Sequence, residues 1–195
     1  LPKVVQVYEG LDIAPRLIFS LKSGSRYYTI VSDPSYAIKV LIYDVTTPEV
    51  PVQLPVRTGA VNNIYEWTKD DSARVLALTH GDGKLRLYRY DAYLASGAAF
   101  AEYAPTTGKF FTQPTFDDQG SLWILESSKN ASAAQKLLRF MPSGSGYAKT
   151  ELTPYPEAVS PRFMHASAGY LAVGGTLLVD GKFRNEVYLF KIETA

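Results

Sequence analysis

The chain has 195 residues, with 20 Lys and Arg against 19 Asp and Glu, so its net charge is +1. A charge so close to zero provides no long-range field to attract nucleic acid or an anionic membrane surface, which excludes general polyanion binding. The chain holds no cysteine, so disulfides, thiolate catalysis, zinc–thiolate sites and iron–sulfur clusters are excluded too.

The composition favours strands over helices. Tyr and Phe number 14 and 9, whereas Met numbers only 2, and aromatic side chains suit a pleated, half-buried surface. Short β-rich runs bounded by Gly, Pro, Asp, Asn and Ser recur along the chain, and no window of a dozen residues keeps helical spacing. No apolar run approaches the ~20 residues of a membrane-spanning helix. We therefore predict a nearly all-β protein without a membrane span.

Four of these runs are spaced regularly. In chain order they are RYYTIV (26–31), ARVLAL (73–78), SLWIL (121–125) and GYLAV (169–173). If Tyr27, Val75, Leu122 and Tyr170 are equivalent, the steps between them are 48, 47 and 48 residues. A constant step of this size is the signature of a structural repeat.

Further strands accompany each run. A short strand precedes it, ending at Phe19, Trp67, Phe116 and His165, and another follows it, ending at Tyr43, Tyr88, Phe140 and Phe190. A fourth strand follows in three repeats, at 51–56, 99–104 and 147–152. Each repeat is predicted to be a four-stranded antiparallel meander, with boundaries near 14–56, 61–104, 112–152 and 160–192.

Four-stranded units of about 40 to 50 residues are what β-propeller blades are made of, and the chain resembles β-propeller repeat proteins. KVLIYDVTTPEVPVQL (39–54) is similar to the LVIVD-type repeat of bacterial surface proteins, and FDDQGSLWIL (116–125) is similar to the first turn of NHL-type blades. No WD dipeptide follows the third strands, so the resemblance is not to a standard WD40 protein. The expected fold is a propeller of about four blades in residues 1–195.

The two ends of the chain leave two alternatives open. The fourth repeat stops without a fourth strand, while KVVQVYE (3–9) is a strand without a partner in the first repeat. Pairing of 3–9 with 186–192 would close a four-bladed ring and leave no exposed edge. Alternatively, 3–9 belongs to a preceding blade, and the chain supplies consecutive blades of a larger ring.

A candidate ligand site follows from aligning the starts of the innermost strands. APRLIF (14–19) matches SPRFMH (160–165), and QPTF and NNIYEW stand at the corresponding places. This alignment predicts that a ring of residues lies at one mouth of the channel, formed by Arg16, Asn63, Thr115 and Arg162, with His165 facing the channel. Guanidinium groups there could bind a carboxylate or phosphate through bidentate hydrogen bonds. The alternative is that these are solvated rim residues.

The sequence offers little for a metal, a cofactor or catalysis. The two histidines, His80 and His165, lack metal-ligand spacing, and we interpret His80 as a residue of the HGDG turn. No nucleophile elbow and no phosphate-binding glycine loop are present. We therefore expect no metal, no cofactor and no catalytic residue.

The paired carboxylates of Asp117 and Asp118 are interpreted as part of a hairpin turn, because the other repeats carry turn-forming residues at the same place. Their spacing partly resembles the Asp-box of sialidase-type propellers, and a calcium site is the alternative. Trp67 and Trp123 are expected to fill the space between blades.

The leading hypothesis for function is a non-catalytic module that binds a protein or saccharide partner through one propeller face. Resemblance to surface-repeat proteins implies an extracellular or periplasmic location. A propeller-type hydrolase or lyase acting at the channel mouth is the first alternative. A structural part of a larger propeller or oligomer, which self-associates through an unpaired edge strand, is the second.

Overall fold

The computed structural model describes residues 11, 13–33, 38–128, 135–152 and 159–193, with the backbone alone at 60, 159–162 and 177–179. The proposed pairing of 3–9 with 186–192 lies partly outside these residues and stays a prediction. No helix among the described residues is long and apolar enough to cross a membrane.

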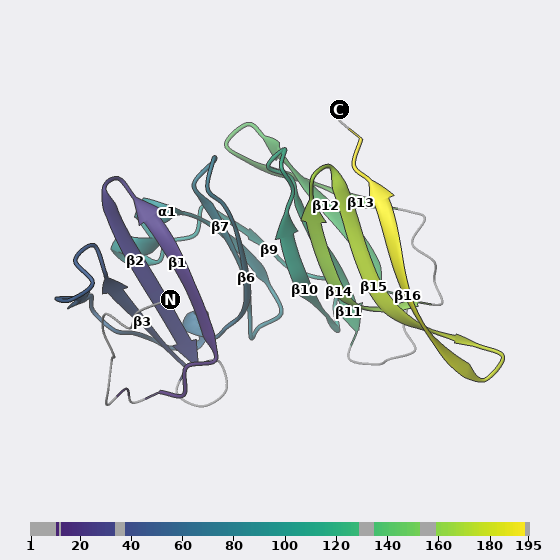
Figure 1. The fold of residues 1–195 in the computed structure, drawn as a ribbon, viewed down its shortest axis with the longest axis horizontal. Coiled ribbons are helices and arrows are strands. Elements are labelled where there is room, and N and C mark those ends of the chain that lie inside the picture. Colours follow the sequence, from purple (N-terminus) through teal and green to yellow (C-terminus); the bar gives the residue numbers. More distant parts are fainter. Residues whose placement is uncertain (1–10, 12, 34–37, 129–134, 153–158, 194–195) are drawn as a thin grey trace, which may run out of the picture.

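The strands form four antiparallel sheets in chain order (Figure 1). Sheet 1 contains β1 (Leu17–Ser23), β2 (Arg26–Asp33), β3 (Lys39–Asp44), β4 (Val52–Gln53) and β5 (Arg57–Thr58). Sheet 2 contains β6 (Ile64–Asp70), β7 (Val75–His80), β8 (Leu85–Arg89) and β9 (Ala101–Tyr103). Sheet 3 contains β10 (Lys109–Phe116), β11 (Leu122–Ser128), β12 (Lys136–Ser143) and β13 (Gly146–Leu152). Sheet 4 contains β14 (Val159–Ser167), β15 (Tyr170–Val179) and β16 (Lys182–Lys191).

The observed strands confirm the repeat. Val75, Leu122 and Tyr170 are the first residues of β7, β11 and β15, and Tyr27 is the second residue of β2. Two short helices were not predicted: η1 (Ala60–Asn62) and α1 (Tyr90–Ser96), which lies between β8 and β9. At seven residues, α1 is too short to show helical periodicity, and it ends at Gly97, whose φ of 71° suits a glycine.

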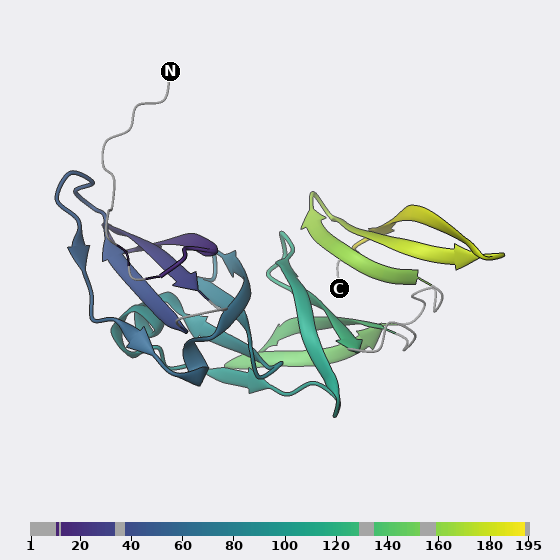
Figure 2. The same ribbon diagram turned by 90° about the horizontal axis from the view of Figure 1, so that it is seen from below.

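The four sheets follow an arc rather than a closed ring. The first strands β1, β6, β10 and β14 lie beside one another in that order. Sheet 1 and sheet 4 lie at opposite ends of the molecule in both views (Figures 1 and 2). Closure of the ring within this chain is therefore not confirmed by the described sheets.

The hydrophobic core is divided into layers between consecutive sheets. Phe19, Ile30 and Leu76 belong to the layer between sheets 1 and 2. Val75, Ala77 and their neighbours fill the layer between sheets 2 and 3, and Trp123 and Leu171 belong to the layer between sheets 3 and 4. Every residue of β7 is buried, because its even-numbered side chains meet sheet 1 and its odd-numbered apolar side chains meet sheet 3.

Both tryptophans pack between sheets, as predicted. The Trp67 ring stacks on Phe19 across sheets 1 and 2, with ring centroids 5.3 Å apart. Trp123 is buried between sheets 3 and 4, and the guanidinium of Arg139 lies over its ring at 4.9 Å. These positions leave neither ring free to serve as an exposed stacking platform.

Candidate functional site

The site begins at the facing first strands of sheets 2 and 3. A cavity of about 520 Å³ opens between β6 and β10, and we call it the 2–3 cleft. It is lined by Tyr65, Glu66, His80, Gly81, Gly83, Phe110, Phe111 and Thr112. A volume of this size falls within the usual range for small-ligand sites.

Two β-bulges shape the walls of the 2–3 cleft. The β6–β7 register shifts between Ile64 and Glu66, and the β10–β11 register shifts between Thr112 and Thr115. A bulge re-aims the side chains near it, and Tyr65 at the first bulge is 52% exposed. Gln113 at the second bulge has a φ of 58°, a conformation that L-residues other than Asn and Asp rarely adopt.

The Glu66 carboxylate joins the two bulges. It accepts hydrogen bonds from the backbone N–H of Gln113 at 2.8 Å, the Gln113 side-chain amide at 3.0 Å and the Thr112 hydroxyl at 3.1 Å. The Thr79 hydroxyl donates to the same carboxylate at 3.4 Å. Burial raises the pKa of Glu66, although each of these hydrogen bonds acts in the opposite direction. Glu66 is thus held as a hydrogen-bonded acceptor at the wall of the cleft.

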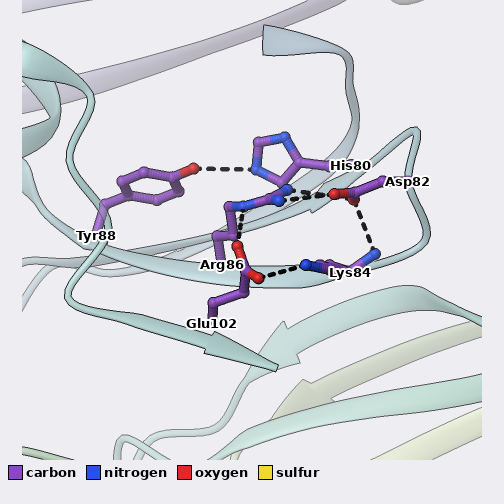
Figure 3. A network of polar contacts seen from close by, with 6 residues as sticks. All are labelled: His80, Asp82, Lys84, Arg86, Tyr88 and Glu102. Atoms are coloured by element: carbon purple, nitrogen blue, oxygen red, sulfur yellow. Dashed lines mark hydrogen bonds and ion pairs between the residues drawn. The ribbon is translucent and has the colours of Figure 1, made fainter. Parts of the chain in front are cut away.

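His80 borders the 2–3 cleft, but its side chain lies on the sheet 1 side of β7 with Tyr88 and is only 2% exposed. Its Nε2 is hydrogen-bonded to the Tyr88 hydroxyl at 3.1 Å (Figure 3). Burial, and then the positive charge of Arg86, lower the pKa of His80 from 6.5 to about 4. Burial also raises the pKa of Tyr88 to about 12. Both groups are neutral at pH 7. His80 is the last residue of β7 and the first of the HGDG turn, where its carbonyl accepts from the Gly83 N–H at 2.8 Å, as predicted. Its ring, however, is part of the interior.

Arg86 is held beside His80 by two carboxylates (Figure 3). Its guanidinium donates to Asp82 through Nη2 at 2.7 Å and Nη1 at 3.2 Å, and to Glu102 through Nε at 2.8 Å. Lys84 donates to the other Glu102 oxygen. Because its donors are occupied and its side chain is largely buried, Arg86 supports the site without reaching a ligand.

A smaller cavity of about 190 Å³ lies on the other side of His80 and touches Arg57, Tyr88 and Tyr93. A third cavity, near the β1–β2 hairpin, is lined by charged groups that are already paired, as in the Lys69–Asp71 and Arg74–Asp91 ion pairs. We take the 2–3 cleft as the candidate site because the exposed Tyr65 ring stands there beside the Glu66 carboxylate, which four hydrogen bonds hold in place.

Searches for sequence relatives gave no match: no protein-family profile and no curated protein sequence corresponds to this chain. Solved structures do match. The propeller domain of Cps50 (Swd1) from Myceliophthora thermophila superimposes with a TM-score of 0.56 at 14% identity, over 92% of this chain and 54% of that domain. The chain has the β-propeller fold. It spans about half the length of that propeller.

Two further solved structures are similar at lower scores. An exo-β-1,3-galactanase from Phanerochaete chrysosporium gives a TM-score of 0.46 at 17% identity, covering 85% of this chain and 43% of the galactanase. A subtype N11 neuraminidase-like protein of an influenza A virus from a flat-faced bat gives 0.44 at 13% identity, covering 94% of this chain and 56% of that one. All identities are low, so the comparisons establish the fold alone.

The propeller arrangement places the predicted ring residues at different heights along the blades. Arg16 is exposed just before β1, where its N–H donates to the Ser32 carbonyl at 3.1 Å. Asn63 directly precedes β6, its carbonyl accepts from the Gly81 N–H at 2.8 Å, and its side chain lies against Gly81. These two residues are at the starting ends of their strands.

Thr115 and His165 lie near the other ends of theirs. Thr115 pairs with Trp123 at the β10–β11 hairpin, and exposed His165 pairs with Ala172 near the β14–β15 hairpin. The backbone of Arg162 lies at the bulge of β14, and its side chain is outside the described atoms. The five residues therefore do not meet at one opening, and their role in ligand binding stays a prediction.

The alignment of strand starts was wrong because strand lengths differ. β10 begins at Lys109, four residues before Gln113, and β14 begins at Val159, so QPTF and SPRFMH lie within strands rather than before them. The buried contact between His80 and Tyr88, beside the 2–3 cleft, carried one usable signal. His80 and Tyr88 stand at alternating positions on the paired strands that flank the HGDG turn, and paired strands place such side chains on one face.

Thr115 instead joins two blades. Its hydroxyl accepts the N–H of Ala166 at 3.2 Å, just as the Thr68 hydroxyl accepts the N–H of Phe116 at 3.3 Å one blade earlier. We expect Thr115→Val to lower the free energy of unfolding by about 1 to 2 kcal/mol, because the buried Ala166 N–H loses its acceptor. Urea unfolding followed by tryptophan fluorescence measures this, with Thr29→Val as the control for the loss of a half-buried hydroxyl. Ala166→Pro removes the N–H that donates to Thr115. If the stability losses of the two single variants add fully in the double variant, the hydrogen bond between Thr115 and Ala166 does not contribute to stability.

Proposed function

We propose that this propeller is a non-catalytic binding module whose ligand enters the 2–3 cleft. The observation that carries the proposal is the exposed Tyr65 ring beside the fixed Glu66 carboxylate in a cavity of about 520 Å³. An exposed aromatic ring beside a fixed polar wall suits a neutral saccharide, whose C–H groups stack on the Tyr65 ring. The Glu66 carboxylate, already bonded to Thr79, Thr112 and Gln113, holds that wall in place. A neutral segment of a protein partner is the other class that this surface fits.

The groups around the cleft argue against catalysis. His80 is buried, neutral and engaged with Tyr88, so it is not free to move a proton to or from a ligand. Glu66 is the one carboxylate among the residues that line the cleft, whereas most glycoside hydrolases need a pair. No group of three His, Asp or Glu that could hold a metal occurs in the described residues.

A propeller-type hydrolase or lyase is the second candidate. The observation that favours it is the raised pKa of Glu66, which is the direction required of a general acid. Measurable turnover of a saccharide that Glu66→Gln abolishes would establish this alternative in place of the binding module.

The binding proposal predicts that Tyr65→Ala weakens ligand affinity about tenfold, because a stacked aromatic ring contributes about 1.4 kcal/mol. A glycan array identifies the saccharide, and isothermal titration calorimetry measures its affinity. Tyr27→Ala removes another half-exposed tyrosine and is expected to leave the affinity unchanged. Equal affinities of the Tyr65→Ala variant and the unmodified chain would place the ligand elsewhere.

Two expectations from the sequence join this proposal. An extracellular or periplasmic location is consistent with a saccharide ligand. Self-association through an unpaired edge strand is proposed at β16, which pairs with β15 alone among the described strands. Both are proposals that the binding experiment does not test.

A further inference from the structure

The cavity of about 190 Å³ beside Tyr88 is distinct from the 2–3 cleft, and we call it the Arg57 cavity. Residues of β5 and η1 line one part of it, and residues of β8 and α1 line another. Its volume is several times that of one water molecule and below the range of drug-sized ligand sites. The cavity therefore suits a small molecule, and the polar groups in its walls indicate which kind.

The guanidinium of Arg57 stands at this cavity without a carboxylate partner among the described residues. Its Nη2 donates to the Leu94 carbonyl at 2.8 Å, and its central carbon lies 5.0 Å from the centroid of the Tyr93 ring. Its Nη1 is buried and has no hydrogen-bond partner in the described part of the chain. The carbonyl at the end of α1 favours a cation but leaves the Nη1 donors unused. A buried guanidinium with unused donors attracts an anion.

The Tyr93 hydroxyl is a second unused donor at the same cavity. Tyr93 is only 3% exposed, and its hydroxyl has no partner among the described residues. Burial raises the pKa of Tyr93, so the phenol keeps its proton at neutral pH and can donate it in a hydrogen bond. The ring is held by an edge contact with the Tyr88 ring, with centroids 5.1 Å apart. Two fixed donors, one of them charged, thus select a ligand that accepts hydrogen bonds.

The charge of the walls favours a monoanion. Arg57 is the one charged side chain among the residues that line the cavity, because His80 and Tyr88 are neutral at pH 7. A phosphate group carries roughly −1.5 to −2 charges at pH 7, which is more than one guanidinium neutralises in a buried place. A carboxylate carries one charge on two oxygens. Ile64 and the Tyr88 ring offer apolar contact to a short alkyl chain.

We propose that the Arg57 cavity binds the carboxylate of a small organic acid, of the size of acetate or propionate. One carboxylate oxygen accepts from Arg57 Nη1, and the other accepts from the Tyr93 hydroxyl. The alkyl group lies against the apolar part of the wall. His80 touches both cavities, but this site uses neither Tyr65 nor Glu66. It therefore holds or fails independently of saccharide binding in the 2–3 cleft.

Titration with sodium acetate at constant ionic strength tests the proposal. Two-dimensional NMR of the ¹⁵N-labelled chain is expected to show saturable shifts of the Asn62 and Gly97 amides, which line the cavity. We expect a Kd of about 1 mM, which is realistic for so small a ligand. Acetamide has the same shape without the charge and should leave these amides unchanged. Equal binding of acetamide, or tighter binding of inorganic phosphate, overturns the assignment to a carboxylate.

Arg57→Gln is expected to weaken acetate binding more than tenfold. Arg89→Gln is the matched control, because Arg89 also lies over an aromatic ring, that of Phe100 at 4.6 Å, and donates to a backbone carbonyl. Arg89 does not line the cavity, so this variant should bind acetate like the unmodified chain. Circular dichroism checks that both variants are folded.

Tyr93→Phe removes the hydroxyl alone and keeps the buried ring, so the test does not depend on whether Arg57→Gln folds. Loss of a hydrogen bond to a carboxylate is expected to weaken acetate binding about tenfold. If Tyr93→Phe and Arg57→Gln bind acetate as tightly as the unmodified chain, the anion binds elsewhere and the proposal is wrong. An unmodified chain whose amide shifts never saturate with acetate contradicts it as well.

Discussion

Asp117→Ala is expected to lower the free energy of unfolding by about 3 to 4 kcal/mol, one of the two largest single-residue effects predicted for this chain. The Asp117 carboxylate is buried and accepts from the backbone N–H groups of Gln119 and Ser121, each at 2.9 Å. It also accepts from the indole N–H of Trp123 at 2.8 Å. Removal of the carboxylate leaves the buried N–H groups of Ser121 and Trp123 without an acceptor.

The ion pair with Arg139 adds to the expected loss. Arg139 Nη2 lies 3.8 Å from the same Asp117 oxygen that accepts from Trp123, and the Arg139 side chain is largely buried. Without Asp117, this guanidinium keeps its stacking on Trp123 but loses its counterion. An uncompensated buried charge is more costly than a lost neutral hydrogen bond.

Two variants separate the contributions. Asp117→Asn keeps an oxygen for the backbone donors. It removes the negative charge opposite Arg139 and places an N–H₂ group where the Trp123 indole N–H needs an acceptor. An intermediate loss of stability is therefore expected. Asp118→Ala removes the adjacent exposed carboxylate and should change stability by less than about 0.5 kcal/mol. Urea unfolding provides the three free energies. If the Ala variants at 117 and 118 have equal stability, the Asp117 carboxylate does not hold the turn.

This turn shows what the sequence revealed. FDDQGSLWIL was interpreted as a hairpin turn because equivalent turns recur in each repeat, and the Asp117 N–H does donate to the Ser121 carbonyl at 2.9 Å. Local pattern was sufficient there, since the turn is closed by residues within five positions of one another. The order of the strands followed from the same repeat, because an apolar run recurs at each second strand. In the two inner sheets this run, β7 or β11, is buried on both faces.

The candidate site depended on information that the pattern lacks. The 2–3 cleft is created by bulges at Tyr65 and Gln113, and a bulge is one inserted residue that leaves the alternation of side chains intact on either side. Glu66 and Gln113 are 47 residues apart, so no local rule connects them. Arg16 and Arg162 looked equivalent because Pro precedes both, yet β14 begins before its Pro-Arg pair and β1 begins after its own.

The burial of His80 was also invisible in the sequence, because glycines and an aspartate follow it as in any exposed turn. We expect this burial to make stability depend on pH between about 6.5 and 4. In that window the unfolded chain binds a proton on His80, with a pKa of 6.5, whereas the folded chain does not until its pKa of about 4. Because the unfolded state binds more protons, the free energy of unfolding falls as the pH falls, by about 3 kcal/mol across the window.

Other groups titrate in the same window, so the test is a difference between variants. The raised pKa of Glu66 means that the folded chain takes up a proton there above the pH at which the unfolded chain does. This stabilises the fold as the pH falls and partly hides the effect of His80. His80→Gln cannot titrate, while its amide can still bond to the Tyr88 hydroxyl. His165→Gln, which removes the other histidine from an exposed position, is the control.

Urea unfolding between pH 4 and 7 is expected to show that His80→Gln loses less stability than the unmodified chain as the pH falls. His165→Gln should lose as much stability as the unmodified chain. The difference should accumulate between pH 6.5 and 4 and then level off. Parallel curves for all three proteins would mean that His80 is protonated in the fold at pH 5. In that case a buried cation would stand beside Tyr88 and Arg86, and the neutral His80–Tyr88 pair would be wrong.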